Sequence, residues 1–187
     1  MKDTAVIALK LALICAVAAA ALSLMNMVTA PRIEAYREQR ILEALQQVSG
    51  EYRIGEMQEA DAQKIEFYYP LYDEEDRTAG YILRIRADGY GGPMQLIAGY
   101  LAEGSVITSR LLDNDETPGL GKEAERPSYM EKFEGKGSSD APIPRRIHQL
   151  SSAHADAVSG STITFVGIAE GLAAGSSFVQ DLGGRDE

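Results

Sequence analysis

The amino-acid sequence predicts a protein that combines helices and strands: one N-terminal transmembrane helix, followed by a compact domain in which helices pack on a small antiparallel sheet. Three observations predict this. A charge-free apolar segment lies near the N-terminus, short runs rich in aromatic and β-branched residues fill the middle, and apolar residues at helical spacing lie near the C-terminus.

The chain has 187 residues, enough for one domain of common size and an additional segment. Its formal net charge of −10 argues against nucleic-acid binding, which depends on Lys and Arg that neutralise phosphates. Cys15 is the single cysteine, so no internal disulfide or cysteine-ligated cluster can form. An electron carried by this protein would therefore reside on an organic cofactor or on a metal held by other ligands.

Leu11 to Ala30 contains no charged residue. At about 1.5 Å per residue, a helix of this length spans about 30 Å, the thickness of the hydrocarbon core of a bilayer. A cleaved signal peptide is the alternative, but its apolar core usually runs only about 7–15 residues. We therefore predict a retained single-span anchor. Basic residues flank both ends of the segment, so charge alone leaves its orientation open.

After the anchor, apolar residues between Pro31 and Val48 recur at helical spacing. Pro31 is expected to mark the end of the membrane span, and Ser49-Gly50 is expected to end the second helix. The predicted parts are a membrane anchor at 1–31, an amphipathic connecting helix at 32–50 and a globular domain at 51–187.

Four segments of the domain are predicted to be strands, namely 64–72, 78–86, 94–101 and 105–112. The acidic residues 73–76 are expected to form a solvated loop, and the last two strands a hairpin that turns at 102–104. Residues 126–144 are rich in charge, Gly, Ser and Pro, which predicts a surface connection.

The last helix is predicted from Thr162 to Val179. Its buried side is expected to carry Phe165, Ile168, Leu172 and Val179. Glycines at 167, 171 and 175 share one face, which favours close packing of this helix on the sheet over pairing in a membrane.

Two glycine-rich turns flank the hairpin, at 89–93 and 116–122. Glycine lets a backbone approach a ligand closely, although each turn alone is equally typical of an ordinary loop. The second turn is not a nucleotide-binding P-loop, because Glu116 and Glu123 stand where that motif needs Gly and Ser or Thr. His148 and His154 have no Cys or carboxylate cluster beside them in the sequence, so no metal site is predicted.

Residues 156–164 form a small, hydroxyl-rich turn at the start of the last helix, a place that favours phosphate because N–H groups and the helix dipole point outward. The turn resembles the attachment motif of bacterial flavoproteins that carry FMN on a threonine through a phosphoester bond. That motif reads Asp, two variable residues, Ser or Thr, Gly, Ala, Thr. Here its defined positions are Asp156, Ser159, Gly160, Ser161 and Thr162, with Ser161 replacing Ala.

The whole chain, from anchor to last helix, resembles the FMN-binding G subunit of the Rnf-type electron transport complex, a relative of the C subunit of the sodium-pumping NADH:quinone oxidoreductase. The resemblance rests on the order of the anchor, the Tyr-Gly turn, the hairpin, the Glu-Thr-Pro-Gly-Leu-Gly segment and the Ser-Gly-x-Thr helix start. It implies an α+β FMN-binding domain outside the cytoplasmic membrane. It also implies a redox subunit, rather than a stand-alone enzyme, in a complex that couples ferredoxin:NAD electron flow to ion translocation.

The same resemblance implies partners and residue roles. Neighbouring membrane subunits complete the complex, and a separate flavin transferase attaches FMN to Thr162 after recognising a peptide that includes Asp156. Thr164 is the alternative acceptor. The expected FMN neighbours are Gly91 and Gly92 in the first turn, Thr117, Gly119, Leu120, Gly121 and Lys122 in the second, and Ser159, Gly160 and Ser161 in the third.

Two other functions stay open at this stage. The FMN subunit of another extracytoplasmic reductase would carry the same motifs. An anchored scaffolding domain with a decayed flavin motif would explain Ser161, which either changes nothing, since Ser is small like Ala, or weakens recognition by the transferase.

Overall fold

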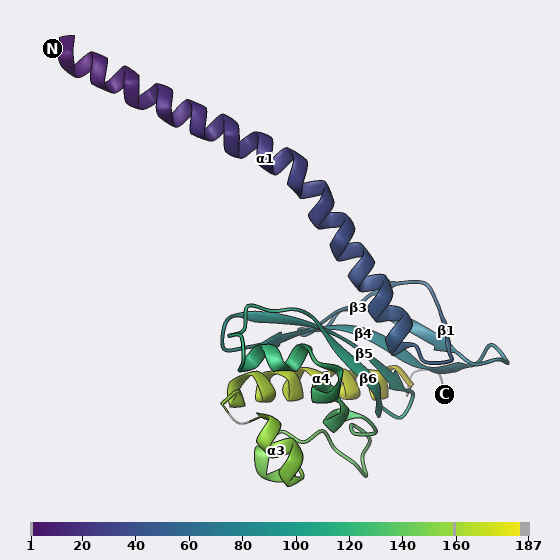
Figure 1. Ribbon diagram of the computed structural model, residues 1–187. Coiled ribbons are helices and arrows are strands. Elements are labelled where there is room, and N and C mark those ends of the chain that lie inside the picture. Colours follow the sequence, from purple (N-terminus) through teal and green to yellow (C-terminus); the bar gives the residue numbers. More distant parts are fainter. Residues whose placement is uncertain (1, 159, 184–187) are drawn as a thin grey trace. The chain divides into compact units, whose positions relative to one another are not determined.

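The computed structural model describes residues 2–158 and 160–183, and it divides the chain into two compact units, 1–41 and 42–187 (Figure 1). Helix α1, Lys2–Val48, begins in the first unit and ends in the second. The expected helix end at Ser49-Gly50 is confirmed, since Ser49 N–H closes the last turn on the Leu45 carbonyl and Gly50 adopts φ +60°.

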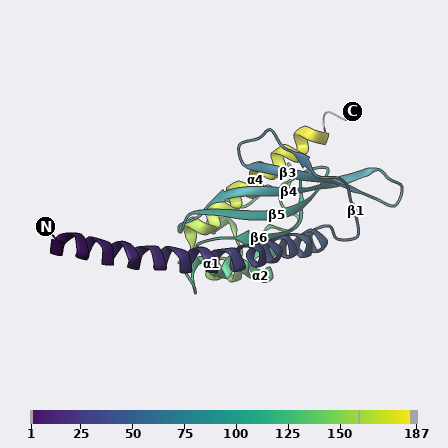
Figure 2. The same cartoon turned by 90° about the horizontal axis from the view of Figure 1, so that it is seen from above.

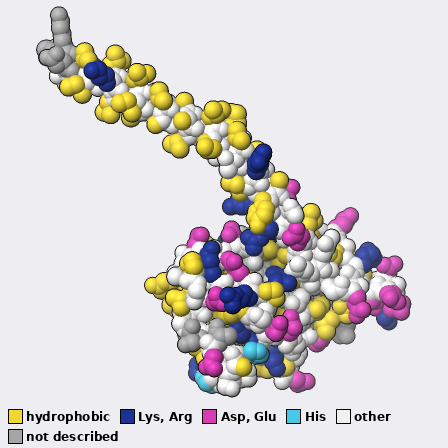
Figure 3. All heavy atoms as spheres, viewed as in Figure 1, with side chains coloured by type: hydrophobic (Ala, Val, Ile, Leu, Met, Phe, Trp, Pro, Cys, Tyr) yellow, Lys and Arg dark blue, Asp and Glu magenta, His cyan; other side chains and the backbone are white. Residues whose placement is uncertain are grey.

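Pro31, the expected end of the membrane span, lies inside α1, so the predicted anchor and the predicted connecting helix are parts of one continuous helix. Proline removes one backbone N–H from the helical ladder, but the bonds on either side are sufficient to carry the helix through. Between Val6 and Val28 the large apolar side chains of α1 are exposed, and they follow one another along the helix in Figure 3. The helix is long and apolar enough to cross a membrane.

The second unit is built on an antiparallel sheet. Its strands are β1 (Arg53–Ile54), β2 (Gln58–Glu59), β3 (Ile65–Tyr72), β4 (Thr78–Asp88), β5 (Pro93–Leu101) and β6 (Val106–Asp113). The order is β1-β3-β4-β5-β6, with β2 also paired to β3. The four predicted strands and the predicted hairpin are therefore confirmed, and the two-residue strands β1 and β2 are additional.

Helix α4, Thr162–Gly183, covers one face of this sheet (Figures 1 and 2). Phe165, Ile168, Leu172 and Val179 are fully buried, as the sequence predicts. The glycine face is also confirmed. A Cβ on Gly167 would overlap the carbonyl oxygen of Asp88, so the helix approaches β4 more closely than any other residue allows.

The opposite face of the sheet is partly covered by the last turns of α1, residues 42–48, which belong to the second unit. Leu45 and Val48 are buried there, and the Val48 carbonyl approaches Gly99 of β5 so closely that a Cβ would overlap it.

The segment after β6 differs from its expectation. It contains the short helices η1 (Gly121–Glu125), α2 (Pro127–Met130), η2 (Glu131–Phe133), η3 (Ile147–Gln149) and α3 (Ser152–Val158). Tyr129, Met130 and Phe133 are buried in the core, and Phe133 stacks on Phe165 of α4 with ring centres 5.7 Å apart. Part of the predicted surface connection is therefore a structural layer beside α4.

Candidate functional site

The three glycine- or hydroxyl-rich turns meet at the N-terminal end of α4 and enclose a cavity of about 540 Å³. A cavity of this size lies within the usual range for organic ligands and cofactors. Its lining comes from all three turns and consists of Tyr90, Glu116, Thr117, Leu120, Gly121, Gly160, Ser161, Thr162, Ile163 and Thr164.

Glu116 joins the three turns. Its side chain is buried, and its carboxylate accepts hydrogen bonds from the Thr164 hydroxyl at 2.8 Å and from the Gly91 N–H at 3.1 Å. A Cβ on Gly89 or Gly121 would overlap the carboxylate oxygens, so both positions must be glycine for the acid to fit. The glycines of the first two turns thus surround a buried acid rather than an open space.

The two threonines at the start of α4 differ in exposure. Thr162 is the first residue of the helix, is exposed and lines the cavity, whereas Thr164 is 1% exposed and donates its hydroxyl hydrogen to Glu116. The first intrahelical bond joins Phe165 N–H to the Ser161 carbonyl, so the N–H groups of residues 162–164 precede it. Because none of the described lining residues is Lys or Arg, an anion in the cavity would depend on these N–H groups and the helix dipole.

Gly160 sets the geometry of the turn before α4. Its φ of +83° lies in the left-handed region that favours glycine, and a Cβ there would press against Leu120 at 3.0 Å. Leu120, Ile163 and Tyr90 are among the exposed large apolar side chains of the second unit. They give the cavity an apolar rim beside its polar floor, an arrangement that suits a planar ring attached to a phosphate.

The short helices α2 and η2 contribute a buried pair, Tyr129 and Lys132. Lys132 Nζ is 3.2 Å from the centre of the Tyr129 ring, and neither Lys132 Nζ nor the Tyr129 hydroxyl has a hydrogen-bond partner among the described residues. Burial lowers the pKa of Lys132 to about 8. Burial raises the pKa of Tyr129 to about 12, with the charge of Glu116 acting in the same direction and the Ser161 hydroxyl against it.

The structure brings together six of the residues that the sequence nominates as neighbours of FMN. These line the cavity: Thr162, Gly160, Ser161, Thr117, Leu120 and Gly121. Gly91, Gly92, Gly119 and Lys122 lie in the same turns without lining it, and Asp156 is exposed on α3. Ser159 lies outside the described residues.

Sequence reasoning did not nominate three of the lining residues, Tyr90, Glu116 and Ile163, as neighbours of FMN, and it named Thr164 only as the alternative acceptor. Glu116 could have been found from the sequence, because a buried acid needs small neighbours and Glu116 is the first residue of a glycine-rich segment. Tyr129 carried no such signal, because its burial depends on how α2 packs in the core.

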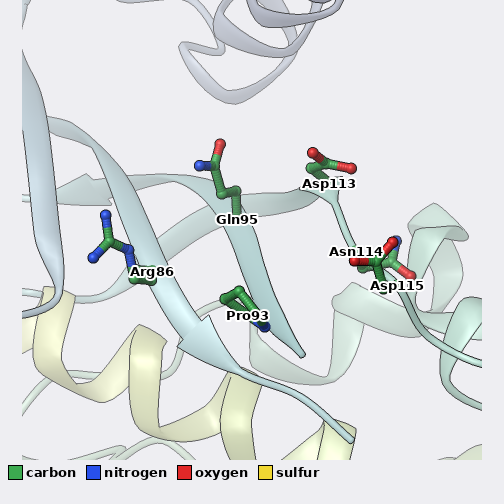
Figure 4. A pocket seen from close by; sticks show the side chains of 6 residues that line it. All are labelled: Arg86, Pro93, Gln95, Asp113, Asn114 and Asp115. Carbon is green, nitrogen blue, oxygen red and sulfur yellow. The ribbon is translucent and has the colours of Figure 1, made fainter. Parts of the chain in front are cut away.

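A second hollow of about 400 Å³ opens on the face of the sheet away from α4 (Figure 4). It is lined by Arg86, Pro93, Gln95, Asp113, Asn114 and Asp115, and Figure 4 shows Arg86, Gln95 and Asp113 along neighbouring strands. Pro93, at the end of the first turn, is its one lining residue from the three turns, whereas all three turns line the larger cavity at α4, which is therefore the candidate site.

Comparison with known proteins supports this choice. Residues 89–176, a segment that contains all three turns, match the FMN-binding domain family. The crystal structure of NqrC from Shewanella oneidensis aligns with a TM-score of 0.52 at 14% identity and covers 69% of each chain. At that identity the likeness shows the fold alone, and it confirms the predicted helix-and-strand architecture.

Three relatives align over most of their length. The chain is 31% identical over 174 residues to the G subunit of the ion-translocating oxidoreductase complex of Stutzerimonas stutzeri, covering 88% of this chain and 76% of that protein. It is 26% identical to the G subunit of the same kind of complex in Methanosarcina acetivorans, with 95% of both chains covered. It is 29% identical to the G subunit of the Na(+)-translocating ferredoxin:NAD(+) oxidoreductase complex of Acetobacterium woodii, covering 90% and 88%.

Proposed function

We propose a function for this chain from a firm premise: it belongs to the family of G subunits of ion-translocating oxidoreductase complexes. Like its relatives, it then works as one subunit among several, and its FMN-binding domain gives it a part in electron transfer. We infer that the complex is of the Rnf type and couples electron flow between ferredoxin and NAD to ion translocation, as the name of the Acetobacterium woodii relative states for that protein.

The residues at the start of α4 fit FMN. The N–H groups at the helix start suit its phosphate, and the apolar rim of Tyr90, Leu120 and Ile163 suits its ring. When bound, FMN supplies the redox chemistry, since its ring accepts and releases single electrons. Thr117 and Gly121 lie on the second turn within reach of the same cavity, while Gly91, Gly92, Gly119 and Lys122 would act through the shape of the turns.

We further propose that Thr162 carries FMN through a phosphoester. One observation supports it above all: Thr162 is exposed in the cavity, whereas the alternative acceptor Thr164 is buried with its hydroxyl committed to Glu116. Ser159, one residue before Gly160 in the sequence, remains part of the proposed attachment motif.

A separate flavin transferase would make the bond, because no His or Lys that could activate the Thr162 hydroxyl is among the described residues that line the cavity. Thr162 Oγ1 bonds to the phosphorus of the FMN moiety of flavin adenine dinucleotide, the phosphoanhydride bond of that donor breaks, AMP leaves, and the hydroxyl proton passes to a base of the transferase. Asp156 is exposed on α3 and available for recognition by that enzyme.

The proposed location is the cytoplasmic membrane, with α1 as a single span and the FMN domain on the extracytoplasmic side. The length and exposure of the apolar part of α1 support a single span. The side rests on the resemblance to the family.

Intact mass and in-gel flavin fluorescence after denaturation test the attachment, on the wild type, Thr162→Ala and Thr164→Val, each co-expressed with a flavin transferase. We expect fluorescence and added FMN mass in the wild type and in Thr164→Val, and neither in Thr162→Ala. A wild type that stays unmodified beside a transferase proven active on another acceptor would overturn covalent attachment and favour a scaffold.

A further inference from the structure

Glu116 places a carboxylate in the lining of the cavity at α4 with no positive side chain opposite it. The residue is 4% exposed, and among the described residues no Lys or Arg lines the cavity or forms an ion pair with this carboxylate. Its two oxygens accept hydrogen bonds from the Gly91 N–H at 3.1 Å and the Thr164 hydroxyl at 2.8 Å. Both donors are neutral, so they hold the carboxylate in place and leave its negative charge uncompensated.

Hydrogen bonding alone does not explain an acid at position 116. A glutamine there could accept from the Gly91 N–H through its oxygen and donate to the Thr164 hydroxyl through its NH₂ group. Burying an amide with these partners costs much less than burying a charge without a cation beside it. The glycines at 89 and 121 leave room for the side chain, since a Cβ on either would overlap it, but an amide would need the same room. The charge itself therefore has a role.

A charge at this position matters for electron transfer because little water reaches it. A buried carboxylate is screened far less than one in water, so its field extends into the cavity that it lines. When a reduced partner subunit passes one electron to a ring held there, the ring gains one negative charge, and no bond forms or breaks. Glu116 then disfavours the reduced form. Its effect is largest at high pH, where a proton least readily follows the electron and cancels the added charge.

We propose that Glu116 tunes the redox potential of the site: its buried carboxylate lowers the midpoint potential of FMN held at the start of α4. This rests on the proposed function, since it requires FMN in this cavity. The hydrogen bonds from Gly91 and Thr164 fix the carboxylate against the first turn and α4, so the charge keeps a constant position. The positive end of the α4 dipole acts in the opposite direction, but the phosphate of FMN at that end offsets it.

Redox titration of the flavinylated full-length chain at pH 9, with soluble one-electron mediators, tests the proposal on the wild type, Glu116→Gln and Glu116→Asp. Glu116→Gln keeps the hydrogen bonds and removes the charge, so it is expected to raise the equilibrium constant for one-electron reduction about tenfold, or about 59 mV. Glu116→Asp keeps the charge and disturbs the geometry, and it is expected within about twofold of the wild type. An unchanged potential in Glu116→Gln, or an equal shift in both variants, would overturn the proposal.

The matched control is Asp115→Asn, which neutralises the neighbouring acid in the sequence. Asp115 is exposed, so water and salt screen its charge, and the same change from carboxylate to amide is expected to alter the equilibrium constant less than twofold. A shift in Asp115→Asn equal to that in Glu116→Gln would show that the potential follows the net charge of the domain. That result would overturn a specific role for the buried carboxylate.

A thiol probe in the unflavinylated chain separates this proposal from the proposed function. Ile163→Cys, in a Cys15→Ala background, introduces one thiol on the exposed apolar rim of the cavity. Its rate of reaction with iodoacetamide measures the thiolate fraction, which a nearby negative charge lowers. Adding Glu116→Gln is expected to raise the rate at pH 7 about three- to fivefold. If the wild type never takes up FMN but the thiol responds, the proposed function fails and the effect of Glu116 on the cavity stands; equal rates would overturn that effect.

Discussion

At the scale of single residues, Glu116 holds the candidate site together. Glu116 is a buried acid that bonds to the first and third turns and is enclosed by glycines of the first and second turns, so a change at Glu116 affects all three turns. Charge-assisted hydrogen bonds contribute roughly 1.5–3 kcal/mol each, and a buried donor left unpaired costs about as much.

We predict that Glu116→Ala lowers the free energy of unfolding by about 3 kcal/mol, since it leaves Gly91 N–H and the Thr164 hydroxyl unpaired and opens a cavity. Glu116→Gln is expected to lose only about 1 kcal/mol, because an amide can still accept from Gly91 while the Thr164 hydroxyl turns to accept from its NH₂ group. Denaturant unfolding of the solubilised full chain measures both. The control is Glu56→Ala at an exposed position, expected within about 0.5 kcal/mol of the wild type; an equally small effect at Glu116 contradicts the role given to it.

The burial of Lys132 leads to a prediction of how the free energy of unfolding depends on pH. Its pKa is about 8 in the folded chain against the ordinary 10.5, because burial disfavours the charged form. Between pH 8 and 10.5 the unfolded chain binds more protons at this residue, so its destabilising effect is full below pH 8 and fades as pH rises. Tyr129 acts oppositely, but only above pH 10, since its pKa rises from 10 to about 12.

Lys132→Met is therefore expected to stabilise the chain by about 1 kcal/mol below pH 8, and by less at pH 10. The shift in pKa sets an upper limit of about 3 kcal/mol, and the cation–π contact with Tyr129 offsets up to about 2 kcal/mol of it. Unfolding free energies at pH 7, 8, 9 and 10 for the two chains provide the measurement. A difference between them that does not change with pH would show that Lys132 is already neutral, or is solvated, at pH 7.

Contacts between single residues were the features that the sequence predicted least well. Thr162, Ser161 and Leu120 were found because they lie in contiguous motifs that can be read without a fold. Tyr129 and Lys132 lie on the short helices α2 and η2, and they are buried because these helices pack in the core, where Phe133 stacks on Phe165 of α4. Contacts of that kind depend on tertiary structure, which no local pattern encodes.

At the scale of elements, local patterns predicted more. β3 to β6 follow from β-branched and aromatic runs bounded by turns, and α4 from its 3.6-residue period. The segment 126–144 was misjudged because its buried residues, Tyr129, Met130 and Phe133, are dispersed among charges in helices too short to show a period. The anchor and the connecting helix, which the sequence separates at Pro31, form one continuous helix, since a long helix tolerates the loss of one hydrogen bond.

The glycine face of α4 gives the element-scale prediction. Gly167→Ala is expected to destabilise the chain by about 1–3 kcal/mol, because the added Cβ overlaps the Asp88 carbonyl oxygen and forces α4 away from β4. This outweighs the gain of up to about 1 kcal/mol that alanine brings to a helix. Gly183→Ala is the matched control, since its Cβ would meet only Ala102 O at 3.5 Å. Thermal melting that ranks Gly167→Ala at or above the wild type would contradict the close packing.

At the scale of the whole molecule, charge and hydropathy are strongly segregated. The apolar stretch 11–30 lacks any charge, while the rest of the chain carries the excess of acids that makes the net charge −10. Apolar side chains of α1 that are exposed in the structure need a hydrocarbon environment, whereas the acidic domain suits water. The segregation predicts an anchored domain but leaves open the side on which the domain lies, since basic residues occur at both ends of the span.

Because the chain has a single cysteine, thiol labelling can measure the side of the membrane on which the domain lies. Cys15 lies within the apolar stretch 11–30, where a membrane-impermeant reagent does not reach a side chain surrounded by hydrocarbon, so the wild type is its own blank. A thiol introduced by Asp61→Cys, at an exposed position of the domain, is expected to react with a membrane-impermeant maleimide in right-side-out vesicles. A thiol introduced by Thr4→Cys, on the other side of the span, is expected to react only after detergent is added. The reverse pattern would place the domain in the cytoplasm, and with it the FMN and its electron partners, while leaving α1 as the membrane anchor.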